Sequence, residues 1–446
     1  MVTTRRQSGV APSPTRKAAA AAAAKKTAKK VHYEFMGPPG ALSIIVGLPL
    51  VCYALVLFCN ADQCVRLDLS NLPSALPSPP GGMPLFTPEA CAVFLGWMAY
   101  CVALHLILPG VRKQGVQLSN GERLTYKLNG MLIFLVTMAI VGYGVWTDQL
   151  DLGWVHDNFL ALLTAGNAFA FALSAYLYAS SFVGRKLLAK GGDTGNPVYD
   201  FFIGRELNPR LGAFDLKVFC ELTPGLIGWL LLDLGFAHKQ YKLTGAVSPA
   251  MALVCAFQAL YVVDALWFEP AILTTMDVTT DGFGFMLAFG DLVWVPFTYS
   301  LQARYILEHP NTLSPTFLAF ILLVKTLGYA VFRGSNLQKN RFRTDPDDPR
   351  VAHLKYIPTK RGTRLLVSGW WGIARHVNYL GDWMMAWAWC LPCGLDHVVP
   401  YFYVVYFGVL LVHRDLRDGE ACAEKYGADW EKYCKLVKYR LVPYLY

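Results

Sequence analysis

One short stretch of the sequence places several chemically versatile side chains in an apolar background. It reads SGWWGIARHVNYLGDWMMAWAW and spans positions 368–389. Within eight residues it carries Arg375, His376, Asn378, Tyr379 and Asp382. A charged side chain at the centre of a bilayer costs roughly 2.5–3.5 kcal/mol on scales from insertion experiments. We therefore expect a pocket here, and the alternative for Arg375, His376 and Asp382 is pairing with each other or with neighbouring helices.

A second apolar segment, FQALYVVDALWFEPAIL at 257–273, also carries polar groups. Tyr261 and Asp264 lie about one turn apart on one helix face, and Glu269 follows at the helix end. A tyrosine hydroxyl in a dry pocket can act as a proton donor when a carboxylate or a second donor supports it. Asp264 alone is equally consistent with hydrogen bonding between helices. Tyr261 is therefore the first candidate acid, and Asp264 and Glu269 are the second.

Two further stretches of the sequence carry basic and aromatic residues. The segment RGSNLQKNRFRTDPDD, at 333–348, contains Lys339 and Arg343. Arginine binds phosphate oxygens as a fork and lysine acts as a point charge, so this pair suits a phosphate-rich ligand. In the final stretch, 413–446, helical spacing places on one face Asp418, Cys422, Lys425 or Tyr426, and Tyr433. Each stretch is also consistent with a solvated surface, or with an amphipathic helix on the membrane.

Several other kinds of site are disfavoured. No GxGxxG follows a strand, so the pattern excludes a Rossmann domain. The nine histidines show neither HxxxH nor HExxH spacing, and we predict no metal site. The eleven cysteines do not suggest a disulfide scaffold, because several lie in apolar runs where cysteine is a small hydrophobe. Cys390 and Cys393 have CxxC spacing without a second pair, which is a weak signal for zinc or redox chemistry.

The composition indicates what positions these residues. Hydrophobic residues make up 54% of the 446 and charged residues 16%, whereas soluble domains have ~45–50% and ~25%. Runs of ~20 apolar residues predict membrane helices. Ten such runs occur, at about 41–59, 90–109, 129–146, 158–182, 216–236, 249–267, 285–305, 315–332, 366–391 and 398–413. We predict an all-α polytopic membrane protein with about ten transmembrane helices and a ligand pocket in its C-terminal half.

The distribution of charge predicts the orientation. Ten spans place both termini on one side, which then holds 34 of the 40 Lys and Arg residues, against three on the other. By the positive-inside rule both termini are cytosolic. Residues 1–36 are basic and of low complexity, so we expect a disordered cytosolic tail, rather than a signal peptide or a mitochondrial presequence. Weak contact with anionic lipid or nucleic acid stays open, and no specific nucleic acid is expected.

Two long blocks resemble the signature stretches of the sterol reductase family. They are LLVSGWWGIARHVNYLGDWMMAWAW and LLVHRDLRDGEACAEKYGADWEKYC, the latter followed by PYLY. GRELNPR and ELTPGLIGW resemble two more, and the resemblance covers about residues 35–446. The family includes sterol Δ14-, Δ7- and C24(28)-reductases and the membrane part of the lamin B receptor. SGWWGIARHVNYLGDW, AWCLPCG and PYFY are most similar to the Δ14-reductase and lamin-B-receptor branch, and the tail is too short for a chromatin-binding domain.

The resemblance implies NADPH bound at the cytosolic end of the C-terminal helices, within about 333–446 of a membrane domain at 37–446. The cofactor residues that it implies, called the cofactor set below, are Lys339, Arg343, Leu366, Trp371, Asn378, Tyr379, Asp418, Cys422, Lys425, Tyr426 and Tyr433. Their chemistry agrees, since cations suit phosphates, rings offer flat faces and an asparagine can hold a carboxamide. The implied proton relay is Tyr261 with Asp418, and Asp418 also belongs to the cofactor set, so its role stays open.

The implied reaction is reduction of the C14=C15 bond of Δ8,14-sterols in sterol biosynthesis. Protonation creates a tertiary cation at C14, which accepts hydride in a site shielded from water. The implied partners are a sterol from the bilayer, membrane lipids and other enzymes of sterol biosynthesis. The implied location is the endoplasmic reticulum membrane, with the nuclear envelope as an alternative. A Δ7- or C24(28)-reductase and a non-enzymatic nuclear-envelope scaffold stay open, and a transporter is disfavoured because no inverted repeat is visible.

Overall fold

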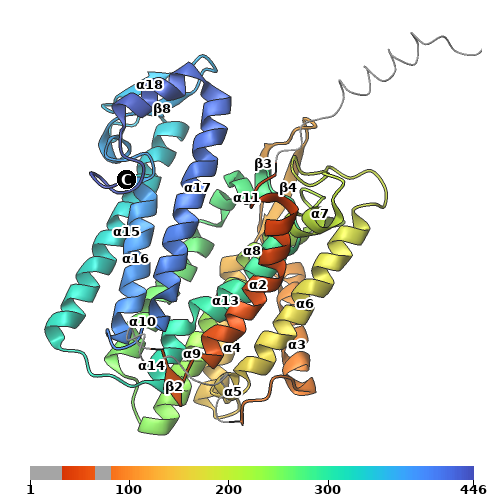
Figure 1. Ribbon diagram of the computed structural model, residues 1–446, viewed down its shortest axis with the longest axis vertical. Helices are drawn as coiled ribbons and strands as arrows, with labels where there is room; N and C mark the ends of the chain where they lie inside the picture. The colour runs from red at the N-terminus through yellow and green to blue at the C-terminus, as the bar shows by residue number, and fades with distance from the viewer. Residues whose placement is uncertain (1–32, 66–81) are drawn as a thin grey trace, which may run out of the picture.

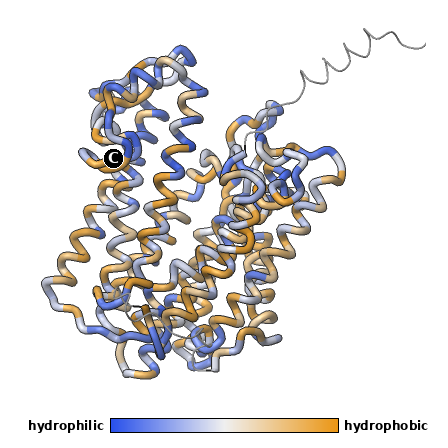
Figure 2. The backbone as a smooth tube through the Cα atoms, in the orientation of Figure 1, coloured by the Kyte–Doolittle hydropathy of each residue, from blue (hydrophilic) through white to orange (hydrophobic). Residues whose placement is uncertain are grey.

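The computed structural model describes residues 33–65 and 82–446, and this part of the chain is mostly helical. Its strands form separate two-stranded antiparallel sheets. Figure 1 shows long helices packed side by side, with the short strands near their ends. Figure 2 shows hydrophobic residues concentrated along these helices and hydrophilic residues towards the ends. The structure is therefore that of an all-α polytopic membrane protein, as the sequence predicts.

The predicted tail lies outside the described residues as far as position 32. The few residues before the first helix contact the folded part. The backbone N–H of Glu34 donates to the hydroxyl of Tyr199 at 2.9 Å, and the ring of Tyr33 meets that of Tyr199 edge-on at 4.8 Å.

The N-terminal half contains long helices joined by short hairpins and turns. Its long helices are α2 (Gly37–Leu57), α3 (Pro88–Ile107), α4 (Gly130–Trp146), α6 (Phe159–Ser180), α9 (Pro224–Thr244) and α10 (Pro249–Trp267). Its short helices are α5 (Trp154–Asp157), α7 (Pro197–Ile203) and α8 (Leu216–Leu222). Its strands are β1 (Cys59–Asn60), β2 (Gln63–Cys64), β3 (Val111–Gln117), β4 (Arg123–Leu128), β5 (Arg210–Leu211) and β6 (Phe214–Asp215).

Short segments then lead to the C-terminal helices. They are η3 (Glu269–Thr274), α11 (Met276–Thr279), α12 (Phe285–Phe289), the π-turn η4 (Gly290–Trp294), α13 (Val295–Tyr299) and α14 (Leu301–Glu308). After them come α15 (Pro315–Thr344), β7 (Tyr356–Pro358), β8 (Arg364–Leu366), η5 (Gly369–Gly372), α16 (Val377–Cys390), η6 (Leu391–Cys393), η7 (Val399–Tyr401), α17 (Phe402–Tyr426) and α18 (Ala428–Leu436). Two glycines bring α15 and α16 into backbone contact: a Cβ on Gly381 would lie 2.7 Å from the carbonyl oxygen of Gly328.

Each of the ten predicted runs overlaps a helical segment. Within the described residues, six helices are long and apolar enough to cross a membrane: Gly37–Leu57, Pro88–Ile107, Phe159–Ser180, Leu216–Thr244, Pro249–Trp267 and Pro315–Thr344. The apolar helix α4 has 17 residues, and the run at 285–305 is divided among α12, η4, α13 and α14. The predicted helix at 366–391 is wrong in its first residue, because α16 begins only at Val377. Gly369, with φ of 63°, and the η5 turn precede it.

The cysteines differ in part from expectation. Cys59 and Cys64 pair across β1 and β2 and form a disulfide. The sequence analysis missed it, although the two lie in one short loop directly after an apolar helix. Cys390 and Cys393 are free, buried thiols. The amide of Gln302 donates to the Cys390 sulfur at 3.6 Å, so this CxxC pair packs against a neighbouring helix.

Candidate active site

The cofactor set gathers at one end of three neighbouring helices. Figure 1 shows α18 and β8 lying over the ends of α15, α16 and α17. The segment between α15 and α16 folds back as the β7–β8 hairpin and the η5 turn. This arrangement explains how residues from 339 to 433 meet in one place.

Lys339 and Trp371 form the contact between α15 and η5. The Lys339 Nζ lies 3.8 Å from the centre of the Trp371 ring. The indole N–H donates to the carbonyl of Ser335 at 2.9 Å, and Trp371 is buried with Leu366. Arg343, one helical turn after Lys339, is exposed and near enough to interact with it electrostatically. Lys339 therefore lies against a fixed aromatic ring, with Arg343 close enough to act on it.

Tyr379 and Asp418 connect α16 to α17. The Tyr379 hydroxyl donates to the Asp418 Oδ2 at 2.9 Å. The ring of Tyr379 stacks on that of His376 at 4.7 Å, and His376 Nε2 lies 3.3 Å from Asp415. Burial lowers the pKa of His376 to about 4, against the opposing effect of Asp415, so this imidazole is neutral near pH 7. His376 supports Tyr379 and carries no charge of its own.

The side-chain amide of Asn378 has only one of its two ends hydrogen-bonded within the described residues. Its amide nitrogen donates to the Asn336 Oδ1 at 3.4 Å. Its own Oδ1 is buried and has no hydrogen-bond partner among the described residues. A buried polar atom without a partner typically costs about 1–3 kcal/mol. A ligand donor such as a carboxamide N–H would satisfy it.

Helices α17 and α18 supply the other wall. Asp418 and Cys422 both interact electrostatically with Lys339. Tyr433 is buried, its ring stacks on Trp430 at 4.9 Å, and it interacts electrostatically with Cys422. Burial raises the pKa of the Tyr433 hydroxyl, which therefore stays protonated. Lys425 and Tyr426 lie at the rim of this wall, where the Lys425 Nζ is 5.1 Å from the Tyr426 ring.

Arg375 has a structural role. Its Nε donates to the carbonyl of Val437 at 2.9 Å, and a second guanidinium nitrogen donates to those of Lys438 at 3.2 Å and Cys434 at 3.4 Å. These bonds fasten the segment after α18. For Arg375 and His376 the structure therefore favours the alternative of pairing with neighbouring elements.

Tyr261 lies in an aromatic environment on α10, near the buried Lys325, whose Nζ is 5.5 Å from the ring of Trp389. The Tyr261 ring meets Trp389 edge-on at 5.2 Å and lies 6.0 Å from Trp229. The charged group that acts on it most strongly is Asp382, which follows Tyr379 by one turn of α16. Asp382 is therefore near enough to Tyr261 to act on it electrostatically and lies one turn of α16 from Tyr379. The sequence analysis named Asp382 without giving it a role; its three-residue spacing from Tyr379 was the available signal.

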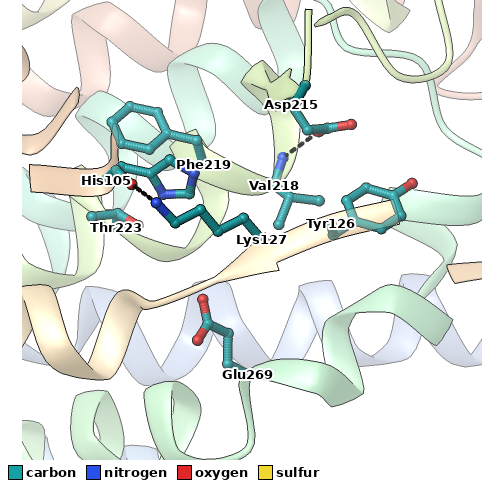
Figure 3. A pocket seen from close by; sticks show the side chains of 9 residues that line it. His105, Tyr126, Lys127, Asp215, Val218, Phe219, Thr223 and Glu269 are labelled. Atoms are coloured by element: carbon teal, nitrogen blue, oxygen red, sulfur yellow. Dashed lines mark hydrogen bonds between the residues drawn. The ribbon is translucent and has the colours of Figure 1, made fainter. Parts of the chain in front are cut away.

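The two second-choice acids have structural partners. Asp264 accepts from the Tyr329 hydroxyl at 2.9 Å and pairs with Arg333. Glu269 accepts from the backbone N–H of Gly130 at 3.1 Å, at the start of α4. Figure 3 shows Glu269 facing a small polar cavity of about 10 Å³, the space of a single water. Burial raises the pKa of Glu269 to about 7.

The chain is similar over most of its length to several known proteins. Residues 29–446 match the model of the Ergosterol biosynthesis ERG4/ERG24 family. The chain is 49% identical to Delta(14)-sterol reductase erg24 of Schizosaccharomyces pombe, over 94% of this chain and 98% of that protein. It is 48% identical to mouse Delta(14)-sterol reductase TM7SF2, over 94% and 99%. For chicken Delta(14)-sterol reductase LBR the identity is 48%, over 93% of this chain and 64% of that protein. The chain belongs to the Ergosterol biosynthesis ERG4/ERG24 family.

Proposed function

We propose that this protein is an NADPH-dependent sterol Δ14-reductase of the endoplasmic reticulum membrane. The observation that carries the proposal is the unpartnered Oδ1 of Asn378, buried at the same helix ends as Lys339 and Trp371. The acceptor suits the carboxamide of a nicotinamide dinucleotide, the cation suits its phosphates, and the aromatic face suits its flat rings. The relatives named above are all called Delta(14)-sterol reductase, which favours this bond over the Δ7 or C24(28) bond.

Each wall of the pocket suits one part of NADPH. Lys339 and Arg343 would hold phosphates, Asn378 the carboxamide, and Trp371 and Tyr433 would lie against the flat rings. The rest of the cofactor set would close the pocket around them: Leu366, Tyr379, Asp418, Cys422, Lys425 and Tyr426. When bound, NADPH supplies hydride.

Tyr261 is the proposed proton donor. The target alkene is a poor electrophile, so C15 must be protonated to place positive charge on the tertiary carbon C14. Trp229 and Trp389 pack on Tyr261 and exclude water, which would otherwise trap the cation. The hydrogen bond from Tyr379 to Asp418, with Asp382 one turn away, offers a route for a proton back to Tyr261.

We further propose that both termini, and with them the cofactor pocket, face the cytosol. The 34 Lys and Arg residues assigned to that side support this orientation. The disulfide between Cys59 and Cys64 supports it independently, because it lies beyond the far end of α2 and disulfides persist in oxidising compartments such as the lumen of the endoplasmic reticulum.

The test is sterol analysis of a Δ14-reductase-deficient cell that expresses the full chain or its Asn378→Ala variant. We expect Δ8,14-sterols to disappear with the wild-type chain and to persist with the variant at equal protein level. A fall in a Δ7 or C24(28) species instead would keep the family and change the bond. No change in any sterol, with folded protein present, would refute an enzymatic role and favour the scaffold.

A further inference from the structure

Apolar side chains line a partly open cavity of about 350 Å³ in the N-terminal half of the bundle. Its walls come from α3, the loop before α6, α9 and the η4–α13 segment. The lining residues that matter here are Glu89, Val93, Trp97, Asp151, Gly228 and Phe297. Pockets that bind small molecules typically measure about 300–1,000 Å³, so this cavity can hold a lipid-sized ligand.

The cavity is separate from the candidate active site. Its lining residues all lie between positions 89 and 297, whereas the cofactor set lies between 339 and 433. Tyr261 does not line it either. In Figure 1, α3 and α15 lie on opposite sides of the molecule. A ligand in this cavity would therefore not meet the groups assigned to catalysis.

The cavity lies in the part of the bundle that crosses the membrane. Both α3 and the segment containing α9 are long and apolar enough to span a bilayer. Along α3 the lining runs from Glu89 to Met98, which corresponds to about 14 Å at 1.5 Å per residue. Val93 lines the cavity and is 45% exposed, and the cavity is partly open. A molecule in the hydrocarbon layer is thus next to the cavity.

The walls are flat and rigid. The Trp97 indole N–H donates to the carbonyl of Pro224 at 3.2 Å, and its ring stacks on Tyr100 at 5.6 Å. On the facing helix, Gly228 has no side chain, and a Cβ there would meet Trp97 only at 3.4 Å. Flat apolar walls favour a fused ring system over an acyl chain, because the rigid ligand loses less conformational entropy on entering.

Two carboxylates, Asp151 and Glu89, line the cavity, and only Glu89 is proposed to accept a hydrogen bond from a ligand. Asp151 is already engaged, with Lys242 at 2.9 Å and with the backbone N–H of Gly153 at 3.0 Å. Glu89, in the first turn of α3, is a second carboxylate and can accept a hydrogen bond from a hydroxyl. One acceptor at the end of an apolar slot matches a molecule with one hydroxyl on a rigid hydrocarbon.

We propose that this cavity is a second, non-catalytic sterol site. It takes a 3-hydroxysterol from the bilayer, with the hydroxyl at Glu89 and the rings between Trp97 and Phe297. The proposal goes beyond the reductase function and does not depend on which bond the active site reduces.

The experiment uses the full chain in lipid nanodiscs with a cholesterol analogue that carries a ring diazirine and an alkyne. After illumination, we expect crosslinked peptides from 89–98 and 150–162, and excess cholesterol should suppress them. Gly228→Phe places a ring inside the cavity and should lower this crosslinking about tenfold. Ile140→Phe, at a position 54% exposed on α4, is the matched control and should leave it unchanged.

Glu89→Leu sharpens the test, because it removes the acceptor and should raise the cholesterol concentration needed for half competition severalfold. Monodispersity and the unfolding temperature report folding, and Leu231→Phe fills the same cavity if Gly228→Phe does not fold. Unchanged crosslinking in a folded cavity-filling variant would overturn the proposal, as would equal competition by a phospholipid without a sterol. Because no readout involves turnover, failure of the reductase proposal would leave these outcomes interpretable.

Discussion

Two regions of this molecule, the ends of α15–α17 and the cavity between α3 and α9, hold their side chains in different ways. At the ends of α15–α17, directional hydrogen bonds fix the side chains, as from Trp371 to Ser335 and from Tyr379 to Asp418. Between α3 and α9, the cavity is lined mostly by apolar side chains, and one hydrogen bond, from Trp97 to the carbonyl of Pro224, fixes a side chain there. Directional bonds orient reacting groups, whereas apolar contacts select for shape and area. The first region is therefore suited to chemistry and the second to retaining a lipid.

The three candidate carboxylates, Asp264, Glu269 and Asp418, also differ in their partners. Asp264 has an arginine and a tyrosine hydroxyl as partners, and Glu269 accepts from the start of a helix. Asp418 accepts from the hydroxyl of Tyr379 and lies in the field of Lys339. A carboxylate paired with arginine resists protonation, so it is a poor acid. Asp418 instead accepts from a hydroxyl, and the nearby guanidinium of Arg414 pairs with Asp277.

The largest expected effect comes from Tyr261. Tyr261→Phe keeps the ring against Trp389 and removes the proposed acid, so turnover should fall about a thousandfold while NADPH binding is retained. Single-turnover sterol reduction and an NADPH titration measure the two quantities. Tyr403→Phe, which changes another tyrosine stacked on Trp389, is the control and should keep its activity. Normal turnover in Tyr261→Phe would remove Tyr261 as the acid.

Lys339 tests the binding side of the same region. Lys339→Met keeps an unbranched side chain, one atom shorter, and removes the charge, so the KM for NADPH should rise about tenfold, with little change in kcat. Lys355→Met, at an exposed position outside the cofactor set, is the control. Equal values of KM for wild type and Lys339→Met would place the phosphates elsewhere.

Much of this comparison could be predicted from the sequence. Hydropathy predicts the helices, because an apolar run of sufficient length has few other stable forms in a bilayer. The candidate site residues can also be predicted, because a polar group within an apolar run requires a partner or a ligand. The contact between Lys339 and Trp371 joins segments that both carried such groups.

The remainder depended on tertiary contacts. The break before Val377 arises where η5 meets α15, and a Cβ on Gly369 would lie 2.6 Å from the Gln338 amide. The role of Asp382 became visible only through its position relative to Tyr261 on another helix. The apolar cavity is formed by α3, α9 and α13, whose residues taken singly resemble any lipid-facing helix.

A substitution at Arg375 tests whether this residue stabilises the fold around the candidate active site or binds the cofactor. Arg375→Ala removes the bonds to Val437, Lys438 and Cys434, and should lower the free energy of unfolding by roughly 3 kcal/mol. The unfolding temperature in detergent measures this loss. Arg364→Ala, at an exposed arginine, should change it little. If Arg375→Ala instead unfolds like the wild type but fails to bind NADPH, then Arg375 belongs to the cofactor site.

The smallest expected effect concerns Glu269, which lies outside both ligand regions. Burial raises the pKa of Glu269 from 4.5 to about 7, so the folded state binds its proton more tightly than the unfolded state does. Its contribution to stability is therefore complete below pH 4.5 and is lost as the pH rises through about 7. Between pH 6 and pH 7 this should cost about 1 kcal/mol.

Glu269→Gln keeps an oxygen for the Gly130 N–H and cannot ionise, so the unfolding temperature of this variant should fall less between pH 6 and pH 7 than that of the wild type. Glu122→Gln, at an exposed position on the β3–β4 hairpin, is the control and should follow the wild type. Parallel curves for wild type and Glu269→Gln would mean that the carboxyl is ionised throughout. Glu269 would then be a charged cap on α4, and its pKa would not be raised by burial.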